Sequence, residues 1–97
     1  MNKAELTEKV AQRTGLPPQK ARELMDALFD PDPAIGLIAQ ELCAGGKVAI
    51  SGFGTFEARP RKARSARNPH TGEEMNIPAT RAPAFKAGKP LKESVRG

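Results

Sequence analysis

The chain has 97 residues and a formal net charge of +5, a length that suits one small domain with little core of its own. The charge is uneven, because residues 1–58 hold six Lys or Arg against eight Asp or Glu, whereas residues 59–97 hold ten against three. The two parts therefore carry −2 and +7, and the basic part predicts a polyanionic partner.

The residue types also exclude several kinds of site. Cys43 is the only cysteine and His70 the only histidine, so an intrachain disulfide, a metal cluster and a His-based acid/base pair are excluded. Cys43 follows an apolar helical run and is expected to be a small buried hydrophobe. No apolar run approaches the roughly 20 residues that span a bilayer, and residues 1–5 lack the apolar segment of an export signal. We therefore expect a protein of the reducing cytoplasm.

Two helices are predicted first. Asn2 suits an N-cap followed by an acid in the first turn, and Gly15 ends this helix. Pro17 and Pro18 suit the start of the second helix, because a missing N–H costs nothing in the first turn. Its apolar residues recur with helical spacing at Ala21, Leu24, Met25, Leu28 and Phe29.

The segment Asp30–Gly36 interrupts the helical pattern. Pro31 and Pro33 cannot both lie inside a regular helix, so a break or a bulged loop is predicted here. Asp32 as N-cap and Pro33 at the first position are expected to restart the helix, which ends at residues 44–46. Its inner face is expected to hold Ile35, Ile38 and Leu42.

A sheet is predicted next. Residues 48–50 alternate as a strand, residues 51–54 form a turn, and residues 55–58 begin another strand. Phe53 and Phe56 are the expected anchors of a core between sheet and helices. Residues 86–96, with Leu91 and Val95 on one face, are expected to form a short closing helix.

Residues 59–83 have the composition of a two-stranded arm. Both faces of the segment 59–67 are basic, so neither can be buried against a core, and the return strand bears prolines typical of an unpaired edge. Such a hairpin is barely stable alone and is expected to project until a partner orders it. Its cations are expected to contact phosphates and can enter a minor groove: Arg59, Arg61, Lys62, Arg64, Arg67 and Arg81.

The tip of this arm is a turn over residues 68–72. Pro69 fixes its own φ, and Gly72 is free to adopt a positive φ. Pro69 has two interpretations from physics alone: a turn residue without further role, which is favoured, or an apolar wedge between base steps.

At this point the pattern resembles the HU/IHF family of bacterial histone-like DNA-bending proteins. The resemblance rests on Gly52-Phe53-Gly54-Thr55-Phe56 leading into Arg67-Asn68-Pro69-His70-Thr71-Gly72, and it extends from Met1 to Lys89. The segments Gly72-Glu73-Glu74-Met75 and Ile77-Pro78-Ala79 look more like HU than IHF.

The resemblance implies an α+β fold: an intertwined homodimer with a helical base, a three-stranded sheet, a projecting arm and a short C-terminal helix, as one domain over residues 1–97. It implies that Pro69 intercalates, which reverses the favoured interpretation above, and that Asn68 at the tip joins the DNA contacts. It also implies contacts flanking the arm from Lys3, Lys86, Lys89 and Lys92, and a dimer core of Phe29, Leu42, Phe53, Phe56 and Phe85. The chain departs from the family at the predicted break at Pro31 and Pro33, which lies in the helical base and outside the arm.

The implied function is that of a nucleoid-associated protein that binds double-stranded DNA with little sequence preference, bending and compacting it. The implied partners are duplex DNA and a second copy of the chain, or a paralogue. We expect no cofactor, no metal, no membrane partner and no small-molecule substrate, and we expect the protein to lie in the cytoplasm, on the nucleoid.

Other functions fit less well. A helix-turn-helix reader around Gly15 would put an acidic helix against phosphates. An enzyme is disfavoured because the glycine-rich segments are incomplete. Residues 44–48 lack the upstream glycine and the following Ser or Thr of a P-loop, and residues 52–54 lack the third glycine of a dinucleotide loop. An RNA module that stacks bases needs exposed aromatic residues, but Trp and Tyr are absent. A basic arm that docks an acidic protein is permitted by charge alone and is opposed only by the family pattern.

Overall fold

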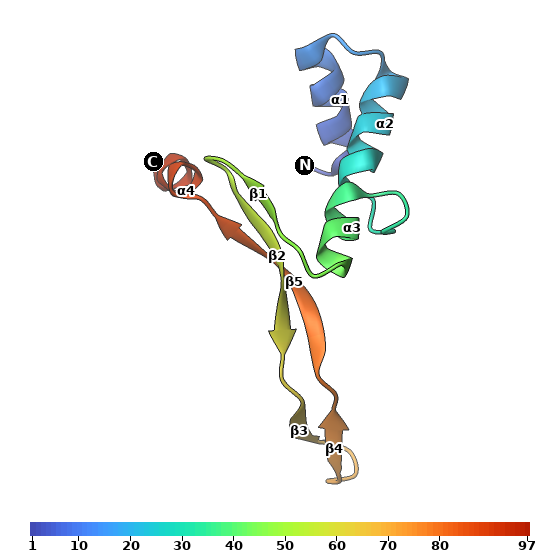
Figure 1. Ribbon diagram of the computed structural model, residues 1–97, viewed down its shortest axis with the longest axis vertical. Helices are drawn as coiled ribbons and strands as arrows, with labels where there is room; N and C mark the ends of the chain where they lie inside the picture. Colours follow the sequence, from blue (N-terminus) through green and yellow to red (C-terminus); the bar gives the residue numbers. More distant parts are fainter. The chain divides into compact units, whose positions relative to one another are not determined.

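The structure is a computed structural model that describes residues 1–97 (Figure 1). Its internal contacts divide the chain into two units, Met1–Ala44 and Gly45–Gly97, which are described separately. The observed α+β element order confirms the predicted one: helices first, then a sheet with a hairpin arm, then a short helix. None of the helices combines the length and apolar character needed to cross a membrane.

The first unit begins with a helix pair. Helix α1 (Lys3–Thr14) starts at Asn2, whose side-chain oxygen accepts the Glu5 N–H at 2.8 Å, and ends at Gly15 with φ 76°. Both predicted caps are confirmed, and each satisfies backbone groups that a helix end leaves open. Helix α2 (Pro18–Phe29) packs beside α1 and buries Ala21 and Met25, the only fully buried hydrophobic side chains of the chain.

The predicted interruption of the second helix is confirmed, but its restart was placed too early. Helix α3 spans Leu37–Cys43, with Gly36 rather than Asp32 as its N-cap residue. The Asp32 carboxylate does accept the Ala34 N–H, at 2.9 Å. The backbone carbonyl of Asp32 accepts the N–H groups of Ile35 and Gly36. These bonds close one isolated turn, so Pro33 does not begin the helix and Ile35 is 54% exposed instead of facing inward.

The loop returns to its starting point because Gly36 has no side chain. A Cβ on Gly36 would lie 2.0 Å from the carbonyl oxygen of Asp30, so only glycine permits this approach. The Asp30 carboxylate also accepts the Asp32 N–H at 2.9 Å. Residues 31–36 are therefore looped out between α2 and α3, as Figure 1 shows beside the green helix.

The second unit holds a three-stranded antiparallel sheet in the order β1-β2-β5, with β1 at Val48–Ile50, β2 at Gly54–Arg61 and β5 at Thr80–Ala87. The predicted turn between β1 and β2 is confirmed, with φ 77° at Gly52. Helix α4 spans Lys89–Arg96 and starts three residues later than predicted, because Lys86 and Ala87 still pair with β2.

The arm continues from this sheet as two successive ribbons. After β2 and β5 part, β3 (Arg64–Arg67) and β4 (Glu74–Ile77) form a separate antiparallel pair. The register places Ala66, Met75 and Ile77 on one side of this outer ribbon together with Arg64, so this side is partly apolar and still carries a cation. The strip is small, and Met75 remains 45% exposed.

Large apolar side chains are poorly covered within a single chain. Phe85 lies against Phe56 and Phe53, with ring centroids 4.8 and 5.6 Å apart, yet Phe85 is 42% and Phe53 46% exposed. Phe29 is also 46% exposed. Cys43, expected to be buried, is exposed at the last position of α3, where the helix gives way to a turn.

Candidate nucleic-acid interface

The sheet of the second unit has one apolar and one basic face. Opposed residues of an antiparallel pair share a face, and successive residues alternate. The pairing of Phe56 with Phe85 and of Ala58 with Pro83 therefore gives an apolar face. The other face holds Arg59 and Arg61 of β2, together with Lys86 of β5 opposite Thr55.

This basic face continues into an open hollow at the start of α4. The hollow has a volume of about 580 Å³ and is lined by Lys86, Lys89 and Lys92. Backbone of residues 49–55 forms its other wall, where Gly88 donates its N–H to the Phe53 carbonyl at 2.8 Å. No acidic residue lines it, and none of the three lysines joins an ion pair. Three uncompensated ammonium groups around one hollow favour a polyanion.

One carboxylate lies on the basic face. Glu57 accepts a hydrogen bond from Arg59 Nε at 2.8 Å, and its other oxygen lies 3.6 Å from Lys47 Nζ. The hydrogen bond from Arg59 is the main cause of a lowered pKa at Glu57, which burial opposes and the charges of Arg59 and Lys47 reinforce. Glu57 therefore stays ionised at neutral pH, and Arg59 can contact a phosphate only by leaving this carboxylate.

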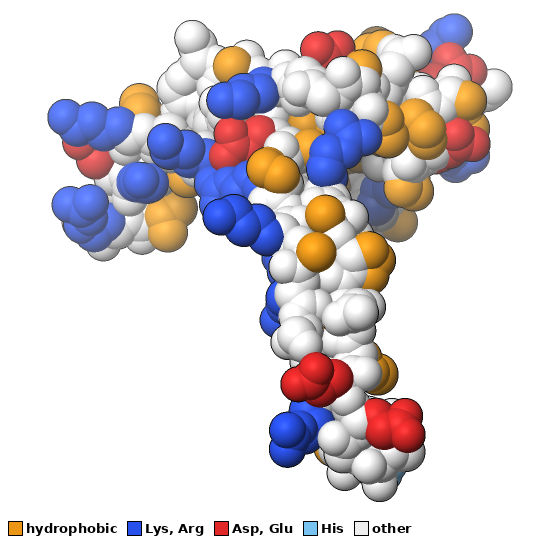
Figure 2. Space-filling view, turned by 60° about the horizontal axis from the view of Figure 1, so that its bottom comes forward, with side chains coloured by type: hydrophobic (Ala, Val, Ile, Leu, Met, Phe, Trp, Pro, Cys, Tyr) orange, Lys and Arg blue, Asp and Glu red, His pale blue; other side chains and the backbone are white.

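A second hollow lies where the arm changes from one ribbon to the next. Its volume is about 530 Å³, and it is lined by Arg61, Lys62 and Arg64 with Ile77 and Pro78. These three cations are exposed and join no ion pair within the chain. Figure 2 shows Lys and Arg side chains gathered along one side of the arm, with hydrophobic ones on the other.

The arm ends in a turn that its own polar groups hold. Asn68 donates its N–H to the Glu73 carbonyl and accepts the Gly72 N–H at its own carbonyl, both at 2.8 Å. Its side-chain oxygen accepts the His70 N–H at 2.9 Å. Gly72 has φ 73°, as predicted. The turn thereby exposes Pro69 and His70 at the end of the arm, while Asn68 has a structural role there.

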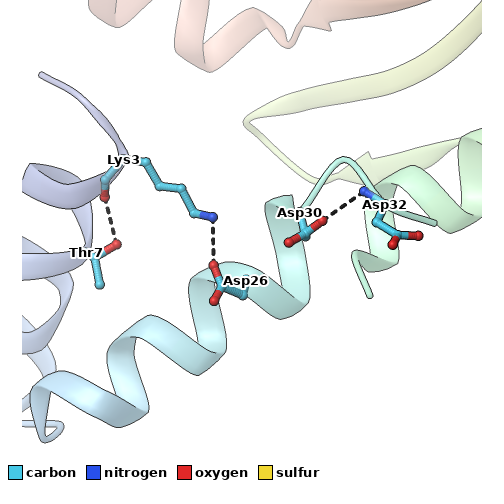
Figure 3. A network of polar contacts seen from close by, with 5 residues as sticks. All are labelled: Lys3, Thr7, Asp26, Asp30 and Asp32. Atoms are coloured by element: carbon cyan, nitrogen blue, oxygen red, sulfur yellow. Dashed lines mark hydrogen bonds and ion pairs between the residues drawn. The ribbon is translucent and has the colours of Figure 1, made fainter. Parts of the chain in front are cut away.

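In the first unit, Lys3 is held by a carboxylate. Its Nζ on α1 lies 2.7 Å from Asp26 Oδ1 on α2, and the Lys3 carbonyl accepts the Thr7 hydroxyl (Figure 3). Both side chains of the pair remain about half exposed, so water and salt weaken it. Lys3 can contact a phosphate only by leaving Asp26.

The structure thus brings most of the predicted cations together in the second unit. Arg59, Arg61 and Lys86 share a face, Lys86 shares a hollow with two further lysines, and the arm carries the rest. Arg81 lies opposite Pro60, on the face that carries the phenylalanines. Sequence reasoning missed the two acids that hold predicted cations, Glu57 and Asp26. Glu57 could have been found from its position two residues before Arg59 in the strand.

Comparisons with known proteins agree on one group. A family described as "Bacterial DNA-binding protein" matches residues 1–96. The chain is 50% identical over 96 residues to the DNA-binding protein HU of Geobacillus stearothermophilus, covering 99% of this chain and 100% of that protein. It is 49% identical over 96 residues, with the same coverage, to DNA-binding protein HU-1 of Halalkalibacterium halodurans.

Solved structures give the same result. An Anabaena HU–DNA cocrystal structure matches with a TM-score of 0.85 and 45% identity, over 98% of this chain and 97% of that one. HU from Thermotoga maritima matches with a TM-score of 0.64 and 30% identity, over 98% of both chains.

Proposed function

Because this chain belongs to the HU family of bacterial DNA-binding proteins, we propose that it binds duplex DNA through its arm and bends it as a histone-like protein of the nucleoid. It is a DNA-binding protein and not an enzyme. The observation that carries the proposal is the basic side of the second unit, where the two cationic hollows lie at either end of the β2–β5 ribbon. The Anabaena relative, which is 45% identical, was crystallised with DNA.

The arm cations provide an affinity that depends little on sequence. Lysine and arginine contacts to phosphates fix a protein on the duplex without reading bases. We assign these contacts to Arg59, Arg61, Lys62, Arg64, Arg67 and Arg81 on the arm, and to Lys3, Lys86, Lys89 and Lys92 flanking it. Those that join no ion pair, such as Arg61 and Lys86, bind at a lower cost than Arg59 and Lys3, which must first leave a carboxylate.

Pro69 serves as the wedge that bends DNA. It lies exposed at the outermost turn, and the Asn68 and Gly72 bonds fix the backbone around it. An apolar ring between two base pairs costs a few kcal/mol of unstacking, which is offset when the bent duplex contacts more of the protein. Arg67 and Asn68 flank this wedge in the minor groove.

A second copy of the chain covers the apolar surface. Only two hydrophobic side chains are fully buried in one chain, while Phe29, Phe53 and Phe85 are each more than 40% exposed. A chain of this size that leaves its aromatic residues open is typical of an obligate dimer. We therefore assign Phe29, Leu42, Phe53, Phe56 and Phe85 to the dimer core, with two arms per dimer.

The salt dependence of binding tests this function. We expect submicromolar affinity for unrelated duplexes, with log K falling by about 5 to 9 per unit of log salt concentration, as for roughly 6–10 neutralised phosphates. Fluorescence anisotropy with several labelled duplexes at four salt concentrations measures both quantities. An affinity that does not change with salt, or that is lost on most sequences, would contradict the proposal.

A further inference from the structure

His70 is the only histidine of the chain, and it lies in the turn at the tip of the arm. Its backbone N–H is bonded to Asn68, but its imidazole forms no hydrogen bond or ion pair, and the residue is exposed. It follows Pro69 directly in the same turn. Whatever surrounds the wedge in a complex therefore also surrounds this imidazole.

We propose that His70 is a further DNA-contacting residue, which binds in its protonated form in the minor groove beside the wedge. This inference rests on the proposed function. An imidazole changes its charge between pH 5 and 8, unlike the neighbouring arginines. Phosphates line the minor groove, and their negative charge attracts cationic side chains such as an imidazolium. Both ring nitrogens of an imidazolium donate, which suits the acceptors on the groove floor.

The charged groups around the tip do not neutralise the imidazole. Arg67 ends β3 opposite Glu74 of β4, and Glu73 follows the turn. Neither glutamate forms an ion pair with His70. Histidine is the side-chain type whose charge changes between pH 5 and 8, and His70 is the only histidine of the chain.

DNA binding then takes up a proton at each arm. Mass action requires that affinity rises as the pH falls, because the protonated tip binds more tightly. We expect a roughly tenfold rise between pH 8 and pH 5.5 for each arm that engages, the size of one charge-assisted hydrogen bond. Binding of this protein to DNA would accordingly respond to pH in a range where the arginines do not.

The test compares three proteins by anisotropy at constant ionic strength between pH 5.5 and 8. We expect wild type to gain affinity on acidification, H70Q to bind with no more than a twofold change, and H70R to bind at pH 8 as tightly as wild type does at pH 5.5. Equal pH dependence of wild type and H70Q would overturn the inference while leaving the DNA-binding function intact. Failure of all three proteins to bind at any pH would instead contradict the function itself.

Discussion

Replacement of Arg61, Arg64 and Arg67 by alanine together is expected to lower the affinity for duplex DNA by at least about a hundredfold. None of the three joins an ion pair, so each is available to a phosphate without a competing carboxylate. Three contacts at roughly 1 kcal/mol each amount to about 3 kcal/mol. The slope of log K against log salt concentration is expected to become shallower by about 3 for each arm that engages.

A matched control separates arm contacts from overall charge. Lys9→Ala, Arg13→Ala and Lys20→Ala remove the same three charges from exposed positions of α1 and α2. We expect this triple variant to bind within about threefold of wild type. If both triple variants lose affinity equally, the protein attracts DNA by its net charge alone, and the arm has no special role.

Phe85→Ala is expected to lower the free energy of unfolding by about 3–5 kcal/mol, the range for a phenylalanine removed from a closed core. Within one chain Phe85 meets Phe56 and Phe53 but is 42% exposed, so the intrachain contacts alone account for only part of that loss. The remainder arises if a second copy covers the ring. Urea unfolding at several protein concentrations measures both the loss and its dependence on association.

The control for this variant is Val95→Ala, because Val95 is 79% exposed. It is expected to change stability by less than about 0.5 kcal/mol. A Phe85→Ala loss below about 1.5 kcal/mol, with unfolding that does not depend on concentration, would show that no partner covers the aromatic residues.

Local signals in the sequence predicted the caps and turns well. The Asn2 cap, the Gly15 stop and the positive φ at Gly72 each follow from residues within a few positions of the feature. The restart of the helix after Pro33 was wrong for a different reason. The loop closes by backbone contact between Gly36 and Asp30, and the capping preference of Asp32 contains no information about that approach.

The candidate site was predictable in composition but not in pairing. The basic segment identified the cations, and strand alternation after Arg59 indicated which share a face. The Lys3–Asp26 bridge joins residues 23 positions apart, so it depends on how α1 packs against α2. The hollow formed by Lys86 and α4 likewise required the hydrogen bond between Gly88 and Phe53.

The central claim is that the tip of the arm inserts into DNA and bends it, and Pro69→Ala tests this directly. Bending of a doubly labelled duplex is measured by fluorescence energy transfer at saturating protein, with Pro31→Ala as the same substitution at an exposed proline outside the arm. We predict that Pro69→Ala retains affinity within about threefold but loses more than half of the bending, because an alanine methyl cannot fill the space between unstacked base pairs. Bending by Pro69→Ala equal to that by wild type and Pro31→Ala would contradict the account.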